Sequence, residues 1–185
     1  MRIVVGIGNP GREYAGTRHN VGFDVVELLA SRHGTSFRPG PNHGLEASFP
    51  YRGERVLLVK PLTYVNESGR CASRVLAFYK EGVPSLLVVV DDVNLPLAKL
   101  RFRAGGSSGG HKGLRSLIDH LHTEGFARLR VGVGAGDSHQ DLRDHVLSRF
   151  GKEERQPIGA AVERAAEAVE SWFTDPPDRI MGRYN

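Results

Sequence analysis

The chain has 185 residues, of which 39% are hydrophobic and 25% charged, proportions typical of one globular domain with a sizeable core. Its net charge of +4 and sequence pI near 9.5 suit a polyanionic partner, although solubility alone also explains so mild an excess. The single cysteine, Cys71, excludes an internal disulfide framework, and no apolar run reaches the roughly 20 residues that a membrane span requires. We therefore expect one cytoplasmic domain over residues 1–185, with no membrane anchor.

Apolar runs bounded by Gly, Pro or Asp predict three short strands, each buried on both faces, at residues 3–6, 56–59 and 86–90. These strands should be neighbours in one sheet. Apolar residues at helical spacing predict helices between them, near residues 21–29 and 75–79, with Gly82 as the C-terminal stop of the second. Because strand and helix alternate, the predicted class is α/β.

The remaining segments predict a sheet that is mixed rather than wholly parallel. Residues 45–51 form a weaker strand pattern that can pair with the next strand as a hairpin through Arg52, Gly53 and Glu54. Alternation predicts a half-exposed strand at 99–103. A helix at 113–121, a strand at 127–133 and an amphipathic helix at 157–173 follow.

The stretch GIGNPG, Gly6 to Gly11, matches the G-x-G-x-x-G dinucleotide-binding fingerprint. In that fold the glycine turn opens directly into a helix, and an acidic residue about 20 positions on meets the ribose at the end of a second strand. Here helical periodicity begins only beyond Thr17, and Asp24 and Glu27 lie inside the helix. The glycines therefore indicate a tight turn rather than a nucleotide cofactor.

Polar residues follow each buried strand, and functional groups in α/β sheets collect at such strand ends. Asn9 follows the first strand, Asn66 the second, and Asp91 the third. The nearest candidate for a proton acceptor is His19, at the start of the first helix with Thr17 as a possible N-cap; a surface or capping histidine is the alternative. Lys60, Tyr64, Asp92 and Asn94 lie beside these groups, whereas His120 and His122 face different ways on a helix, so we expect no metal site.

Residues 105–113 carry five glycines and must form a loop before the next helix. Backbone N–H groups in such a loop can hold an oxyanion or phosphate, but the Walker A pattern is absent. The segment also fits G-x-S-x-G with Ser107 as nucleophile. A nucleophile elbow follows a buried central strand, whereas the strand before this loop alternates basic and apolar residues, which argues against a serine esterase.

Two basic stripes flank the glycine loop. Lys99, Arg101 and Arg103 share one strand face at a spacing of two, as do Arg128 and Arg130 on the following strand. The stripes predict a phosphate-binding track, because arginine contacts phosphate in a bidentate manner. A solvated face or a protected sheet edge is the alternative.

Four segments, in this order and spacing, resemble bacterial-type peptidyl-tRNA hydrolases: GIGNPGREYAGTRHNVGF, KPLTYVNESG, DDVNLPLAKLRFRAGGSSGGHKGLRSL and FARLRVGVG. The resemblance implies hydrolysis of the ester between a peptide and the terminal ribose of tRNA, which recycles tRNAs dropped by stalled ribosomes. It also implies a monomer with a single-domain, three-layer, phosphorylase/hydrolase-like fold, in which helices flank a twisted mixed sheet, and no cofactor.

By this resemblance His19 matches the catalytic base, and Asp91 the carboxylate that stabilises its basic form. Asn9 matches a residue that helps to discriminate N-blocked from free aminoacyl groups. The chemistry is reasonable, since His19 can deprotonate a water while Asp91 holds the ring tautomer. Asn66 or a backbone N–H can stabilise the oxyanion.

The same resemblance assigns Tyr14, Tyr64 and Asn66 to substrate binding, and Arg103 and Arg130 to the tRNA 5′ phosphate near the acceptor end. Lys112 stands where many members have asparagine, and a lysine offers donors but no acceptor. Val65 stands where methionine is usual. Both departures bear on substrate affinity more than on the type of reaction.

Two other functions stay open at this point. A catalytically silent tRNA- or RNA-binding module on the same fold would explain the basic stripes and Lys112, although the presence of both His19 and Asp91 argues for catalysis. The serine esterase that uses Ser107 ranks last.

Overall fold

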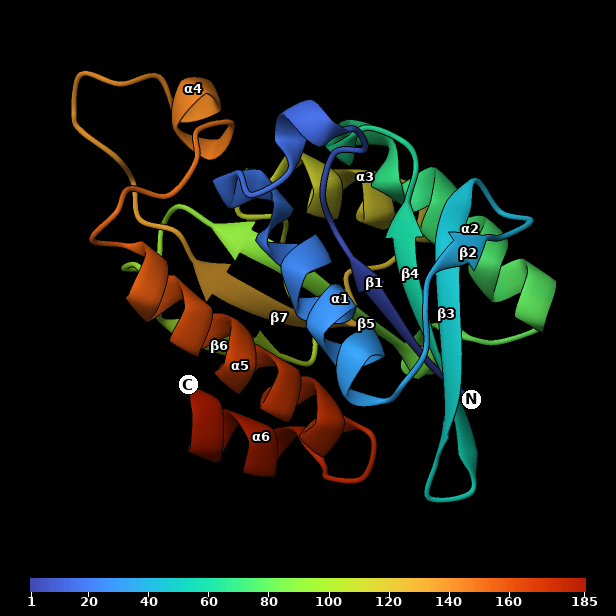
Figure 1. Ribbon diagram of the computed structural model, residues 1–185. Helices are drawn as coiled ribbons and strands as arrows, with labels where there is room; N and C mark the ends of the chain where they lie inside the picture. Colours follow the sequence, from blue (N-terminus) through green and yellow to red (C-terminus); the bar gives the residue numbers. More distant parts are fainter.

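The computed structural model describes all 185 residues and shows one seven-stranded mixed sheet with helices on both faces (Figure 1). The strand order is β2-β3-β4-β1-β5-β7-β6. The strands are β1 (Arg2–Gly6), β2 (Arg38–Pro39), β3 (Gly44–Tyr51), β4 (Glu54–Pro61), β5 (Leu86–Asp92), β6 (Leu100–Arg103) and β7 (Ala127–Gly132). The predicted α/β class and mixed sheet are confirmed.

The centre of the sheet is parallel and its two margins are antiparallel. β1 pairs in parallel with β4 on one side and β5 on the other, as predicted for the three apolar runs, and β5 pairs in parallel with β7. β3 and β4 form the predicted antiparallel hairpin, and its two turn residues, Arg52 and Gly53, both have positive φ (47° and 85°), as a tight two-residue hairpin turn requires. β6 runs antiparallel to β7 and forms one edge.

Helices cover the sheet in two layers. α1, α5 and α6 pack on one face, and α2 and α3 on the other, each over its own apolar cluster (Figure 1). The helices are α1 (Val21–Arg32), α2 (Ser68–Tyr79), α3 (Lys112–Leu121), α4 (Leu142–Val146), α5 (Arg155–Trp172) and α6 (Pro177–Tyr184), and the 3₁₀ turns are η1 (Arg12–Tyr14), η2 (Arg18–Asn20), η3 (Val65–Glu67) and η4 (Val83–Ser85). No helix combines the length and apolar character that crossing a lipid bilayer demands.

Two predicted helix boundaries were wrong in detail. α2 ends at Tyr79 because Lys80, rather than Gly82, adopts the left-handed conformation (φ 55°) that closes the helix. Thr17 precedes η2, but its hydroxyl donates to the carbonyl of Tyr14 and caps no N–H group. Thr17 contributes through its backbone, because its carbonyl accepts the N–H of Asn20 at 3.0 Å.

The glycines of GIGNPG serve close packing and a turn. A Cβ atom on Gly6 would lie 2.4 Å from the carbonyl oxygen of Gly22 in α1, so the helix can approach β1 only because residue 6 is glycine. Gly11 has φ 110°, and the chain after it enters η1 and η2 before α1 begins at Val21. No α-helix starts at the glycine turn, which agrees with the rejection of the dinucleotide fingerprint.

Candidate active site

Polar side chains gather at the carboxyl ends of the parallel strands, the upper edge of the sheet in Figure 1. Asn9 follows β1, Asn66 lies in the η3 turn after β4, and Asp91 is the penultimate residue of β5. Each strand is buried for most of its length, and its first polar residues therefore come where it leaves the core. The structure confirms that these strand ends lie side by side, since β1 is paired with both β4 and β5.

His19 and Asp91 are in direct contact. His19 lies in η2, and its Nδ1 is 2.9 and 2.8 Å from the two carboxylate oxygens of Asp91. Because an ionised carboxylate only accepts hydrogen bonds, the Nδ1 atom of His19 carries the proton. The other ring nitrogen, Nε2, has no protein partner, and the side chain is 14% exposed. Its lone pair is free to accept a proton.

A second histidine, His111, holds the same carboxylate. Its Nε2 lies 2.8 Å from Oδ1 of Asp91, while its Nδ1 accepts the backbone N–H groups of Gly113 (3.0 Å) and Leu114 (3.3 Å) at the start of α3. The two accepted bonds fix the proton of the neutral ring on Nε2, which donates it to Asp91. We call His19, Asp91 and His111 the histidine–aspartate cluster.

Sequence reasoning missed His111 as a site residue. One signal was present: a polar residue that immediately precedes a predicted helix, after a glycine-rich loop, is a candidate N-cap whose ring faces the strand ends. Serine, threonine, aspartate and asparagine are the usual N-caps, so a histidine at that position has a reason to be examined.

The environment of Asp91 keeps it ionised. Burial, with only 2% of the residue exposed, acts to raise the pKa of the carboxyl, but the two histidines outweigh it through their charge and their hydrogen bonds, and the pKa lies well below its usual range. Asp91 is therefore an acceptor at neutral pH and orients both rings.

Asn9 is held so that only its amide nitrogen is available. Its backbone N–H and carbonyl both bond the side chain of Asn20 at 2.9 Å, and its own Oδ1 accepts the backbone N–H of Val65, also at 2.9 Å. Nδ2 has no protein partner, so its two N–H groups remain available as donors. Asn20 was not singled out from the sequence, because its role is to fix the turn rather than to meet a ligand.

The side chains of the other predicted substrate residues form no hydrogen bond within the protein. Tyr14 and Tyr64 meet edge to face, with ring centroids 6.3 Å apart, and Tyr64 is 57% exposed. Asn66 and Lys112, from η3 and the first turn of α3, are exposed and form no side-chain hydrogen bond. These residues are available to a ligand but no contact fixes their geometry.

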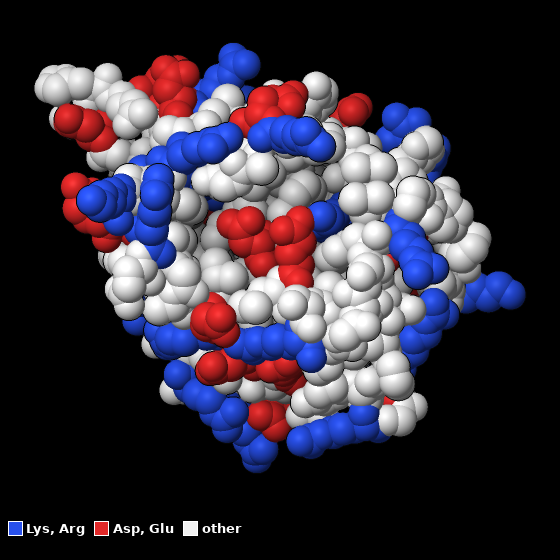
Figure 2. Space-filling model, in the orientation of Figure 1, with Lys and Arg blue, Asp and Glu red and all other residues white.

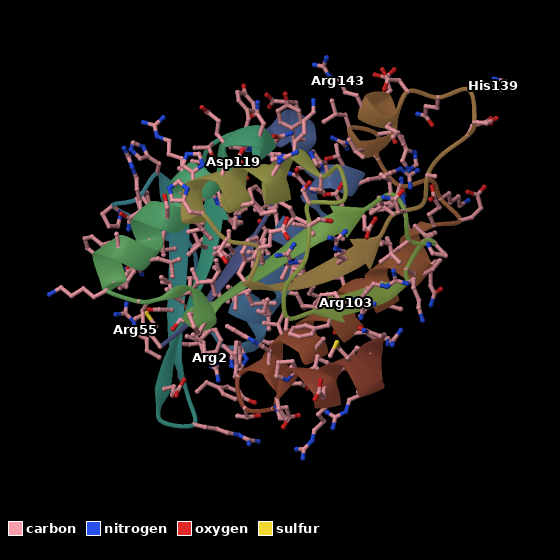
Figure 3. The ribbon with its side chains drawn as sticks, turned by 180° about the vertical axis from the view of Figure 1, so that it is seen from behind. Arg2, Arg55, Arg103, Asp119, His139 and Arg143 are labelled. Carbon is pink, nitrogen blue, oxygen red and sulfur yellow. The ribbon has the colours of Figure 1, made fainter.

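The basic stripes of β6 and β7 lie side by side, as predicted. Arg101 stands opposite Arg130, and Arg103 opposite Arg128, on the sheet face that lies next to α3 and has no helix over it (Figure 3). Like charges in directly opposed positions destabilise a sheet. On the opposite side of the molecule, by contrast, basic and acidic side chains are interspersed (Figure 2).

One member of the predicted phosphate track is not available. Arg128 is fully buried, and its guanidinium donates to the carbonyls of Gly106, Ser107 and Glu124. Burial, and then repulsion from Arg130, lowers the pKa of Arg128 to about 10. Its role is to fix the path of the glycine loop, because the loop carbonyls need a donor away from water. The prediction that Arg128 contacts phosphate was therefore wrong.

Arg101, Arg103 and Arg130 form what we call the basic face. Arg101 and Arg103 are exposed, and Arg103 lies on the uncovered part of the sheet in Figure 3. Arg130 is half-buried, with Asp92 at 3.5 Å and the carbonyl of Ser107 at 3.0 Å. Asp92, through Arg130, is the one carboxylate within ion-pair distance of these three guanidinium groups, so the basic face carries a net positive charge.

Two chemical alternatives fit the geometry poorly. The ligand atoms of His19, Asp91 and His111 lie within 4.8 Å of one another, a spacing that a metal could bridge. A metal on Nε2 of His111 would have to replace the proton fixed there, at the cost of the bonds that Nδ1 accepts. Ser107 follows an edge strand rather than a central one, and its hydroxyl bonds no histidine or carboxylate.

The site combines a buried carboxylate that orients an imidazole, a free nitrogen on that imidazole, and amide donors. This arrangement is typical of an enzyme that activates water. Fold and site together define a hydrolase of the α/β class with a cationic surface beside its site. The family comparison is specific: residues 3–185 match the peptidyl-tRNA hydrolase family model, and the chain belongs to that family.

Named peptidyl-tRNA hydrolases match the chain over its full length. The chain is 44% identical to the peptidyl-tRNA hydrolase of Geobacillus thermodenitrificans over 185 residues, and the alignment covers all of both chains. The corresponding enzyme of Chloroflexus aggregans is 46% identical, with 100% of this chain and 99% of that one covered. The crystal structure of peptidyl-tRNA hydrolase from Acinetobacter baumannii superposes with a TM-score of 0.93 at 33% identity, covering 100% of this chain and 94% of that one.

Proposed function

We propose that this enzyme, which hydrolyses peptidyl-tRNA as a member of its family, cleaves the ester with a water molecule that His19 activates as general base. The observation that carries the proposal is the orientation of His19: Nδ1 is bound to the two oxygens of Asp91, at 2.8 and 2.9 Å, and Nε2 is free. A base in this arrangement typically contributes about 10²- to 10⁴-fold to the rate.

Asp91 stabilises the charge that develops on His19. When Nε2 takes a proton from water, the ring becomes an imidazolium whose Nδ1–H already points at an ionised carboxylate. His111 donates to the same carboxylate and prevents it from rotating away. The pair is thus set before substrate arrives, and little reorganisation accompanies the proton transfer.

Asn9 distinguishes N-blocked from free aminoacyl groups by donating a hydrogen bond. Because its Oδ1 is occupied by the N–H of Val65, Nδ2 is the atom that meets the substrate. A peptide or N-acetyl group offers a carbonyl to this donor, whereas a free aminoacyl group brings an ammonium that would have to lose its hydration next to another donor. Asn66, which has no protein partner, supplies a donor for the oxyanion.

The basic face receives the nucleic acid. Arg103 and Arg130 contact the 5′ phosphate next to the acceptor end of the tRNA, Lys112 adds a cation at the start of α3, and Tyr14 and Tyr64 line the entry for the acylated end. The substrates are peptidyl-tRNAs released prematurely from ribosomes, so the enzyme acts in the cytoplasm and returns tRNA to use. It acts as a monomer.

The test is release of the acyl group from N-acetylated and from free aminoacyl-tRNA. The wild-type chain should hydrolyse the first and spare the second, and His19→Ala should abolish turnover while the protein stays folded. Near wild-type turnover by His19→Ala would exclude His19 as the base. Tight tRNA binding without any release by the wild type would instead favour a silent RNA-binding module, and full activity of Ser107→Ala would eliminate the serine esterase.

A further inference from the structure

Arg18 precedes His19 in η2, yet its side chain runs in another direction and is almost fully buried. The residue is 8% exposed. Its guanidinium forms two bonds with the carboxylate of Glu154, at 2.7 and 2.8 Å, a fork-to-fork arrangement that fixes both distance and orientation. A buried arginine with a bidentate partner is restricted far more than a surface one.

The same turn is tied to the segment after α4 by further bonds. Nε of Arg18 donates to the hydroxyl of Ser148 (3.1 Å), and the backbone N–H of Arg18 donates to the carbonyl of Ser148 (3.0 Å). The guanidinium also lies 4.9 Å from the ring centroid of Phe150. These contacts bridge about 130 residues of sequence and place the turn with His19 against the connection between α4 and α5.

Glu154 is itself fixed in place. Its Oε1 accepts the backbone N–H of Gly151 at 2.9 Å, and the residue stands at the start of α5. The hydrogen bond from Arg18, together with that of Gly151, holds the pKa of Glu154 at about 2, so the carboxylate is charged at neutral pH. The pair therefore joins the His19 turn to a long helix that packs on the sheet.

We propose that Arg18 and Glu154 are positioning residues for catalysis: the ion pair orients η2 so that the His19 ring meets Asp91 with its free nitrogen facing the substrate. Neither residue touches the reacting atoms. The inference rests on the proposed function, because it assumes that His19 is the base. Displacement of a catalytic group by about 1 Å can lower a rate by about 100-fold, so partial loss of the anchor should lower kcat by about 10-fold.

The key variant is Glu154→Gln, which keeps the shape and an acceptor for Gly151 but removes the charge. Arg18→Lys keeps the charge and loses the fork, and Arg18→Gln/Glu154→Gln completes a double-mutant cycle with Arg18→Gln. Arg32→Gln is the matched control, since Arg32 also joins the α1 segment to α5, through Glu163 and Glu170, but lies far along the helix from His19.

The measurements are kcat and KM for N-acetyl-aminoacyl-tRNA, and the NMR signal of the His19 ring proton shared with Asp91. Glu154→Gln should lower kcat by about 10-fold with KM within about twofold, and should weaken or shift the ring-proton signal. Arg18→Lys should recover part of the loss relative to Arg18→Gln. The double variant should be no worse than the poorer single one, while Arg32→Gln should match wild type.

Several outcomes would overturn the inference. One is a wild-type kcat for Glu154→Gln, verified as folded, while His19→Ala is inactive. Another is a Glu154→Gln protein whose ring-proton signal is unchanged and whose loss of kcat equals that of Arg32→Gln. The Arg18–Glu154 pair would then be merely structural. Activity that persists in His19→Ala would instead contradict the proposed function, so the two failures are distinguishable. If Arg18→Gln does not fold, Glu154→Gln and Arg18→Lys still decide the question.

Discussion

The histidine–aspartate cluster and the basic face use charge in opposite ways. In the cluster every polar atom except Nε2 of His19 has a protein partner, and the buried carboxylate of Asp91 accepts bonds from both histidines. On the basic face Arg101 stands opposite Arg130 with one carboxylate at 3.5 Å to offset three guanidinium groups. The polar groups of the first region are satisfied within the protein, whereas the positive charge of the second is only partly offset there.

This difference predicts which substitutions lower kcat and which raise KM. In the proposed mechanism the cluster acts on the reacting ester, so a change there should lower kcat. A change on the basic face removes a contact that is made equally in the ground state and the transition state, so it should raise KM. Changes in the two regions should also differ in their response to salt, because in the proposed binding mode only the basic face releases counterions from tRNA.

The largest effect is expected for Asp91→Asn. An amide can accept from His111, but its N–H group cannot accept the Nδ1–H of His19, so the ring is driven to the other tautomer and Nε2 ceases to be a base. We expect kcat to fall by about 10²- to 10⁴-fold with KM within a few-fold. Single-turnover release from N-acetyl-aminoacyl-tRNA measures this directly. A loss confined to KM would show that Asp91 binds substrate instead.

His111→Asn should have a smaller effect of the same kind. Asparagine is a good N-cap, so α3 keeps its start, but the shorter side chain cannot reach Asp91. One donor to the carboxylate is lost and the other, from His19, remains. We expect kcat to fall by about 10-fold, in line with the loss of a hydrogen bond to a charged group. A wild-type kcat and melting temperature in His111→Asn, with both lowered in His111→Ala, would mean that the histidine only caps the helix.

Arg130→Met should affect binding instead. Removal of one phosphate contact should raise KM by about 5- to 10-fold, leave kcat nearly unchanged, and reduce the slope of log affinity against log salt by about 1. Arg55→Met is the control, because Arg55 lies on the β3–β4 side of the molecule, away from Arg103 (Figure 3). A normal salt slope in Arg130→Met would remove this residue from the tRNA contact.

The sequence was informative where local patterns decide the structure. The buried strands, and hence the positions of Asn9, His19 and Asp91, could be predicted because the apolar runs are long and the strand ends of parallel sheets coincide. The role of His111 could not, since it depends on the path of a glycine loop. Arg128 donates to the carbonyls of that loop. In the sequence Arg128 occupies the same kind of alternating strand position as Arg130, so the pattern does not reveal that the two have different roles.

Elements that depend on distant contacts were also missed. α4 has five residues and α6 eight, too short for a clear periodicity. α6 is located by contacts with the edge strand, where the side chain of Asn185 bonds both the N–H (2.6 Å) and the carbonyl (3.1 Å) of Phe102. Such an amide takes the place of a neighbouring strand, and nothing near Asn185 in the sequence indicates it.

Asp24 is a partly buried carboxylate without a hydrogen-bond donor, and so contrasts with Asp91. No hydrogen bond reaches it, and burial, followed by repulsion from Glu27, raises its pKa to about 6 despite the attraction of Lys60. Since the folded pKa exceeds the unfolded value, the folded state binds the proton more tightly, and stability falls as pH rises from about 4 to 6. Asp91, with two donors, shows the opposite shift.

Asp24→Asn should therefore stabilise the protein by about 1–2 kcal/mol at pH 7.5, where the wild-type carboxyl is charged in both states, and by almost nothing at pH 4, where the folded protein holds it neutral. Urea unfolding at the two pH values measures the difference. Asp119→Asn is the matched control, because Asp119 is exposed and forms no ion pair, so the same substitution should give no gain at either pH. An equal effect of Asp24→Asn at both pH values would mean that folding does not shift the pKa of this carboxyl. The lack of hydrogen-bond donors would then not be what distinguishes Asp24 from Asp91.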